Sequence, residues 1–192
     1  MVATDNFQKI EVSSRQELRE WLYQNHLQVH SVWLATYKKS IPEKYLSTAD
    51  VLDELLCFGW IDGIRRKLDS NRTMQLVSPR KAQHLAGTYK SRAAKLIAEG
   101  KMQEGGFRSI AKSKEEGLWD FMDDVDKLII PADLKEVLSR YEGATEFFLS
   151  INPSSKRFVL GWIKLAKTAK VRENRLIKIA TLASKGEKLE GS

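Results

Sequence analysis

The chain has 192 residues, of which 42% are hydrophobic and 30% are charged, as is typical of a globular protein. Its single cysteine excludes an internal disulfide framework and a zinc site built from several cysteines. The net charge is +7, and the whole excess lies in residues 151–192, which hold 10 Lys+Arg and only 3 Asp+Glu.

The chain shows no targeting or membrane-spanning pattern. Residues 1–12 lack the basic start and the apolar run of a secretory signal. No apolar stretch approaches the roughly 20 residues that a membrane-spanning helix needs. We therefore expect a cytoplasmic protein without a membrane span.

The beginning of the chain predicts a strand, a helix and a second strand. Residues 7–12 are expected to form a short strand, and the pattern from Ser14 to Glu17 is a capping box that opens a helix ending near His26. Residues 31–38 are rich in residues that favour strands, so they predict the next strand.

Residues 53–63, with the sequence D-E-L-L-C-F-G-W-I-D-G, predict a helix that turns directly into a strand. Ser47 or Thr48 is expected to cap this helix, and Gly59 suits its left-handed end. From Trp60 onward the period changes to alternation, which favours a strand over residues 60–67. Turn residues then lead to a second strand over 72–78, and the two strands form a hairpin.

Beyond Pro79 the chain predicts helices only. These are expected at residues 85–98, 103–116, 131–140 and 143–150, followed by a helix capped by Asn152 and a last one that closes before Gly186. The fold class is therefore α+β, with a small antiparallel sheet and helices in residues 1–80. Residues 81–192 form an all-helical part, and the two lobes are expected to pack as one compact unit.

Neither a nucleophile nor a metal site is expected. Cys57 lies near the C-terminal end of a helix, where the dipole raises a thiol pKa, so it should be buried and unreactive. The three histidines have no metal-ligand spacing, and Asp123, Asp124 and Asp126 lack the glycine and glutamate of a calcium loop. We expect no metal and no cofactor.

Basic and aromatic residues on or beside the hairpin form one candidate ligand site. Asp62 is expected on the same strand face as Trp60, Ile64 and Arg66, where a carboxylate must be hydrogen-bonded, paired or part of a site. Guanidinium groups beside aromatic rings suit an anionic or stacked ligand. The alternatives are a structural acid and a hydrated sheet edge whose charges prevent edge pairing. The candidate residues are Trp60, Asp62, Arg66, Arg80 and Tyr89.

The basic C-terminal helices form a candidate contact surface. Its cations recur at intervals of three, which places each set on one side of its helix, whereas Trp162, Leu165, Leu176 and Ile179 are expected to pack on the core. A solvated helix exterior is the alternative. Nucleic-acid binding is expected to be weak at most, since no aromatic residue interleaves the cations. The candidates are Lys164, Lys167, Arg172 and Arg175, followed by Lys178.

The chain resembles the YdeI/OmpD-associated family, also called the bacteriocin-protection family, from about residue 30 to residue 186. The resemblance is carried by L-L-C-F-G-W-I-D-G at 55–63, S-P-R at 78–80, A-A-K-L-I-A-E-G-K-M at 93–102, W-I-K-L-A-K at 162–167 and R-E-N-R at 172–175. The chain departs from the family at 82–90, which reads A-Q-H-L-A-G-T-Y-K where members often have S-x-W-S-x-x-N, and at Val171, where they often have Thr.

The resemblance implies a bacterial protein linked to protection against stress or antimicrobial peptides, without an agreed biochemical activity and without catalytic residues to transfer. We predict a non-enzymatic binding protein whose partner is a small anionic ligand or a protein. Two alternatives remain open. One is an enzyme that acts on a small anionic substrate with Asp62 as acid or base. The other is a binder of nucleic acid or of an anionic surface through the C-terminal helices.

Overall fold

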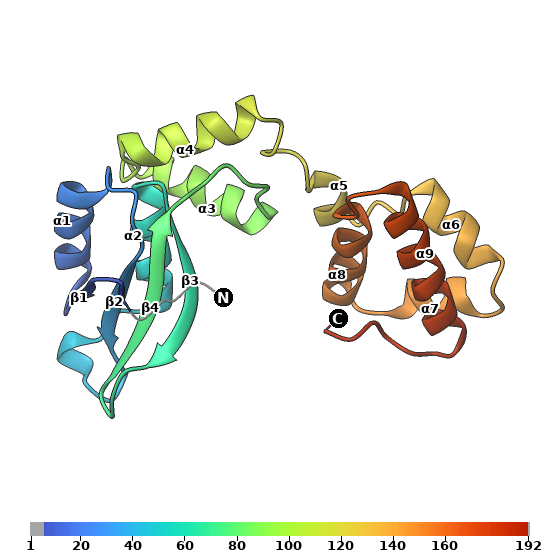
Figure 1. The fold of residues 1–192 in the computed structure, drawn as a ribbon, viewed down its shortest axis with the longest axis horizontal. Coiled ribbons are helices and arrows are strands. Elements are labelled where there is room, and N and C mark those ends of the chain that lie inside the picture. The colour runs from blue at the N-terminus through green and yellow to red at the C-terminus, as the bar shows by residue number, and fades with distance from the viewer. Residues whose placement is uncertain (1–5, 192) are drawn as a thin grey trace. The chain divides into compact units, whose positions relative to one another are not determined.

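The structure of the protein, a computed structural model, describes residues 6–191. Its chain divides into two compact units, Met1–Asp120 and Phe121–Ser192 (Figure 1), which we call the N-terminal and C-terminal units. The sheet and four longer helices belong to the first unit, and the regular elements in the described residues of the second are all helices. The α+β fold class is confirmed.

The N-terminal unit is built on a four-stranded mixed sheet. Its strands lie in the order β1 (Lys9–Glu11), β2 (Val32–Tyr37), β4 (Arg72–Pro79) and β3 (Trp60–Lys67). The hairpin β3–β4 and the pair β2–β4 are antiparallel, as expected, but β1 runs parallel to β2. The sheet is therefore not purely antiparallel, because the helix between β1 and β2 returns the chain in the same direction.

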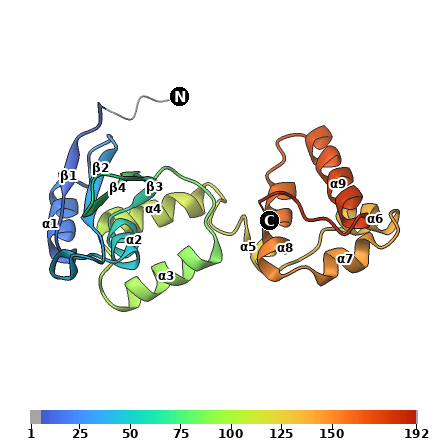
Figure 2. The ribbon, with the colours of Figure 1, turned by 90° about the horizontal axis from the view of Figure 1, so that it is seen from below.

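Helices α1 (Arg15–Asn25) and α2 (Thr48–Cys57) cover one face of this sheet (Figures 1 and 2). The hydroxyl of Ser14 caps α1 by accepting a hydrogen bond from the backbone N–H of Glu17. The hydroxyl of Ser47 caps α2 in the same way, with the backbone N–H of Asp50 as the donor. A 3₁₀ turn, Pro42–Lys44, precedes α2. The expected caps of both helices are confirmed.

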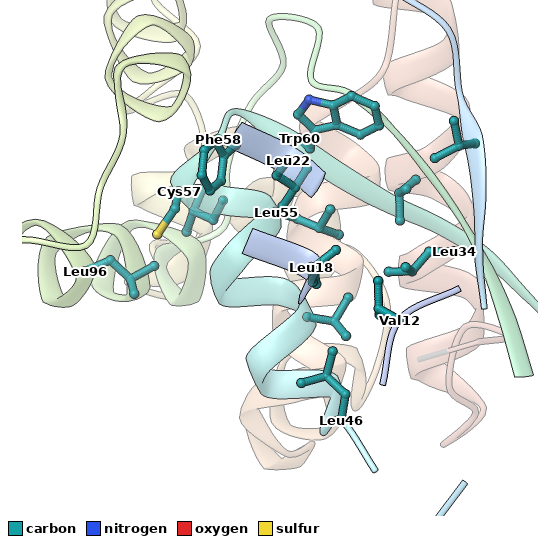
Figure 3. Packing of buried hydrophobic residues seen from close by; sticks show 14 of the residues in the cluster. Val12, Leu18, Leu22, Leu34, Leu46, Leu55, Cys57, Phe58, Trp60 and Leu96 are labelled. Carbon is teal, nitrogen blue, oxygen red and sulfur yellow. The ribbon is translucent and has the colours of Figure 1, made fainter. Parts of the chain in front are cut away.

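The core of the N-terminal unit lies between the helices and the sheet (Figure 3). Leu18 and Leu22 of α1 and Leu55 of α2 pack there with the strand residues Leu34 and Trp60. Burial of such side chains contributes roughly 1.5–3 kcal/mol each. The same cluster includes Ala93 and Leu96 of the next helix along the chain and Met102 of the loop that follows it.

Helices α3 (Gly87–Ala98) and α4 (Glu104–Glu115) therefore belong to the N-terminal unit. The first lobe was expected to end at residue 80, whereas the N-terminal unit extends to Asp120 and so includes these two helices as well. Their apolar side chains have no core of their own, so they are buried against α2 instead. The sequence pattern beyond Pro79 records only a change from strands to helices, which is not the same as a change of core.

Glycines allow α4 to begin directly against the end of α2. Gly59 ends α2 with a φ of +73°, in the left-handed region where glycine is favoured. A Cβ added to Gly59 would lie 2.4 Å from the carbonyl oxygen of Gly105, and one added to Gly106 would lie 2.4 Å from that of Cys57. The backbone N–H of Gln103 also donates to the Cys57 carbonyl at 3.0 Å. The two helix ends meet backbone to backbone.

The C-terminal unit is a helical bundle with its own core. Its helices are α5 (Asp123–Asp126), α6 (Ala132–Ser139), α7 (Ala144–Ser150), α8 (Pro153–Lys164) and α9 (Ala169–Ser184). Asn152 caps α8, as expected, and Thr168 caps α9. Pro131 is the residue before α6 rather than its first residue. Over the described part of the chain, no helix has the length and apolarity to cross a membrane.

We predict that Gly106→Ala destabilises the protein, although alanine favours a helix by about 1 kcal/mol over glycine. The added methyl group would meet the Cys57 and Leu56 carbonyls, at 2.4 and 2.8 Å, and such overpacking costs about 1–3 kcal/mol. Thermal unfolding should show a lower melting temperature. Gly161→Ala is the matched control, because its Cβ would make ordinary contacts at 3.8 Å, and it should be neutral or stabilising. A Gly106→Ala variant as stable as that control would refute the tight crossing.

Candidate functional site

A β-bulge in β3 separates the residues that the strand pattern places together. Asp62 pairs with Val77 in β4, but the register then shifts, so that Arg65 pairs with Gln75 and Arg66 with Met74. The extra residue reverses the alternation, since side chains change face with every residue. The expectation that Arg66 shares a face with Asp62 is therefore wrong. Its guanidinium lies 5.2 Å from the ring of Trp33, on the other side of the sheet.

Trp60 is part of the core rather than of an open site. Its side chain is 0% exposed, and its indole N–H donates to the carbonyl of His26 at 3.2 Å. The ring of Trp21 meets it edge to face, with centroids 5.6 Å apart. A buried indole whose only polar atom is already bonded has no group left to present to a ligand.

Asp62 is held in a polar network that joins the hairpin to two helices. Its carboxylate accepts hydrogen bonds from the amide of Gln75 at 2.9 Å and from the hydroxyl of Tyr89 at 3.2 Å. The carbonyl of Gln75 in turn accepts from Arg65 at 2.8 Å, and Arg65 also donates to the hydroxyl of Thr48 at 3.2 Å. The acid was expected to be hydrogen-bonded, paired or part of a site, and the first of these describes it.

Arg80 lies against this network. Its guanidinium is 5.0 Å from the ring of Tyr89, and its buried Nε–H donates to no acceptor among the described residues. Burial lowers the pKa of Arg80, and burial together with the charge of Asp62 raises the pKa of Tyr89. Tyr89 therefore stays protonated near neutral pH and can keep donating to Asp62. Of the candidate residues near the hairpin, Asp62, Arg80 and Tyr89 come together.

A second buried network, which the sequence pattern did not reveal, joins α1 to α2 and α3. Glu54 is only 1% exposed, and its carboxylate accepts from Arg15 at 2.6 Å and from Arg19 at 2.7 Å. Asp53, one residue earlier, pairs with Arg92 of α3. The sequence signal for this network was a pair of arginines four residues apart on one helix, Arg15 and Arg19, followed by acids on the next helix.

Cys57 lies one turn beyond Glu54 and is fully buried. In Figure 3 its sulfur points toward Leu96 in the core of the N-terminal unit. Burial, with a smaller effect from the charge of Glu54, raises the pKa of the Cys57 thiol to about 11. Such a thiol is almost entirely protonated at neutral pH, so this geometry is that of a packing residue.

In the C-terminal unit, two of the candidate cations are engaged in ion pairs. Lys164 binds Asp124 at 2.5 Å, and Arg172 holds Asp133 through two hydrogen bonds of 2.6 and 3.0 Å. The bond from Arg172 lowers the pKa of Asp133. The pairs join α8 to α5 and α9 to α6. They border a small pocket of about 160 Å³, whose apolar lining is Val125, Ile129, Pro131, Leu160 and Ile163.

Arg175 and Lys178 differ from these two cations. In the part of the chain that the structure describes, neither forms an ion pair with an acid. Their charged groups lie 4.8 and 5.8 Å from the ring centre of Trp162, and Arg175 also donates to the Trp162 carbonyl. The expectation that no aromatic residue interleaves the C-terminal cations is therefore wrong. Lys167 is exposed in the loop between α8 and α9.

Apolar side chains continue this surface along both helices. On α8, Phe158 and Leu165 lie one turn before and after Trp162 and are both 42% exposed; on α9, Val171 lies one turn before Arg175 and is 37% exposed. Of the four residues expected to pack on the core, Trp162, Leu176 and Ile179 do so, Trp162 as a partly buried residue, whereas Leu165 does not. The core is instead filled from a second apolar stripe of α8 that includes Val159 and Ile163. We call the six residues Phe158, Trp162, Leu165, Val171, Arg175 and Lys178 the Trp162 platform.

Two family models match separate parts of the chain. Residues 10–109 match the model described as "Domain of unknown function (DUF8412)", and residues 127–186 match the one described as "Bacteriocin-protection, YdeI or OmpD-Associated". The resemblance to the bacteriocin-protection family is thus confirmed over the C-terminal part. The blocks at 55–63, 78–80 and 93–102 lie in the part matched by the other model. Searches of curated proteins and of solved structures found no match.

We predict that Asp62→Ala destabilises the protein by about 1–3 kcal/mol, because it leaves the largely buried Gln75 amide and the Tyr89 hydroxyl without their acceptor. Chemical denaturation would measure the loss. Asp62→Asn keeps one carbonyl acceptor in the same place and should lose less. Wild-type stability in Asp62→Ala would exclude the structural network and favour a catalytic role for this acid.

We also predict that Cys57 reacts slowly with a thiol reagent in the native protein at neutral pH, because its thiol is buried and protonated. The folded state disfavours the thiolate, so this contribution to stability is complete below pH 9.0 and is lost as the pH rises toward 11. The free energy of unfolding of the wild type should therefore fall more over this range than that of Cys57→Ala. Labelling as fast as that of the denatured chain would contradict the burial.

Proposed function

The chain belongs to the family described as a domain of unknown function (DUF8412), and we propose that it is a non-enzymatic binding protein of the bacteriocin-protection type. In this proposal the Trp162 platform of the C-terminal unit contacts an anionic partner. The platform lies within the part of the chain that matches the bacteriocin-protection family. Three of its members, Trp162, Leu165 and Arg175, come from the two C-terminal sequence blocks that carry the resemblance.

Neighbouring cations of the C-terminal unit differ in their partners: two pair with acids, and two lie beside an indole ring. Lys164 and Arg172 are neutralised by Asp124 and Asp133, which makes them part of the architecture. Arg175 and Lys178 are held near one indole ring and pair with no acid among the described residues. The ring restrains both side chains, so less conformational entropy is lost when they bind an anion.

The arrangement around Asp62 supports binding rather than catalysis. A general acid or base must reach the proton that it transfers, yet both oxygens of Asp62 already accept hydrogen bonds from Gln75 and Tyr89. We therefore assign the Asp62 network to the stability of the N-terminal unit, and the contact with a partner to the C-terminal unit.

We predict that the double variant Arg175→Gln, Lys178→Gln binds fluorescently labelled heparin about tenfold or more weakly than the wild type. Each lost charge-assisted hydrogen bond is worth about 1 kcal/mol or more, and a tenfold change corresponds to about 1.4 kcal/mol. Fluorescence anisotropy at low salt measures the affinity, and added salt should weaken wild-type binding.

The matched control is Lys127→Gln, Lys135→Gln, which removes the same charge from two exposed lysines of the same unit outside the platform. It should keep most of the heparin affinity. Equal losses in both double variants would mean that net charge rather than the platform binds the anion. No heparin binding by the wild type at low salt would refute an anionic partner.

A further inference from the structure

We propose that the Trp162 platform docks on the surface of an anionic lipid bilayer, with its cations among the headgroups and its apolar side chains at the boundary of the acyl chains. This inference rests on the proposed function, because it identifies the anionic partner of the same surface. It adds a requirement that a purely ionic contact does not have: the exposed apolar residues of the platform must take part.

Exposed apolar side chains lie one helical turn away from Trp162 and from Arg175. Phe158 and Leu165 are each 42% exposed, and they flank Trp162 at one-turn intervals on α8. Val171 precedes Arg175 by one turn on α9. Helices α8 and α9 pack on each other (Figures 1 and 2). Arg175 and Lys178 of α9 lie against the Trp162 ring of α8, which joins the two helix faces.

This combination matches the chemistry of a bilayer interface. An indole with a polar edge and an apolar body is favoured at the boundary between headgroups and acyl chains. Arginine and lysine beside it are attracted to the negative surface of anionic lipids, and each such cation is expected to strengthen binding about fivefold. Surface-bound helices place cations and bulky apolar residues next to each other in this way.

A nucleic acid fits the platform less well. Single strands bind by stacking bases on open aromatic rings, but the guanidinium of Arg175 already lies over the Trp162 ring. A duplex would contact only the cations and would leave Phe158 and Leu165 in water. The apolar half of the platform is then unexplained, whereas a lipid surface uses both halves.

The test measures binding of the full chain to vesicles of equal parts phosphatidylglycerol and phosphatidylcholine, by co-sedimentation, with vesicles of pure phosphatidylcholine as the reference. We expect binding to the anionic vesicles only, and a decrease with added salt. The Arg175→Gln, Lys178→Gln variant should bind at least about tenfold more weakly, from the loss of two cations at the surface.

The apolar requirement is tested with Leu165→Gln, which changes a residue that is 42% exposed and lies outside the buried core of the C-terminal unit. It should weaken vesicle binding about threefold or more, since part of the buried apolar area is lost, and leave heparin binding unchanged. The control is Leu149→Gln on α7, an exposed leucine outside the platform, which should change neither. Thermal melts confirm that the variants fold.

Each remaining outcome counts against a stated claim. Heparin binding without vesicle binding overturns the lipid inference and leaves the proposed anionic contact standing. Vesicle binding that Leu165→Gln does not weaken reduces the interaction to simple charge attraction and overturns the docked geometry. Equal binding to both kinds of vesicle excludes recognition of anionic headgroups. Failure to bind either heparin or vesicles overturns both the inference and the proposed function.

Discussion

The N-terminal unit depends on a contact between two stretches of backbone with no side chain between them. Where α2 ends at Gly59 and α4 begins at Gly105 and Gly106, an added Cβ would lie within 2.4 Å of a carbonyl oxygen in every case. This approach brings α4 onto the core and sets the direction in which β3 leaves α2. The Asp62 network and the hairpin are positioned by that turn, so a change at the crossing would displace them as well.

Charge is used differently in the two units. In the N-terminal unit the buried acid Glu54 is compensated by Arg15 and Arg19, and removing one partner of such a group usually costs several kcal/mol. In the C-terminal unit Lys164 and Arg172 are likewise paired, which links its helices. Arg175 and Lys178, on the surface of α8 and α9, differ from these paired cations because their charge has no acidic counterpart among the described residues.

Local sequence determined the elements and most of their ends. The caps at Ser14, Ser47 and Asn152 follow from short-range hydrogen bonding of side chains to backbone, which needs no tertiary contact. The left-handed end of α2 at Gly59 was predictable because glycine adopts that conformation readily, and the burial of Cys57 because it lies beside the apolar Phe58 near the helix end. The resemblance to the bacteriocin-protection family also came from the sequence, and it holds over residues 127–186.

Only the tertiary structure decided which residues meet. The bulge after Asp62 moves Arg66 to the other face of the sheet. Gly63, inside the strand pattern, was the local signal for a bulge, but alternation alone does not reveal the shift in pairing. Trp60 and Trp162 are both tryptophans on apolar stripes, yet the first is 0% exposed in a core, whereas the second is only partly buried against a core and lies beside two cations. Helix α8 carries apolar residues on more than one side, and periodicity cannot say which stripe is buried. That choice is made by the helices that pack against it.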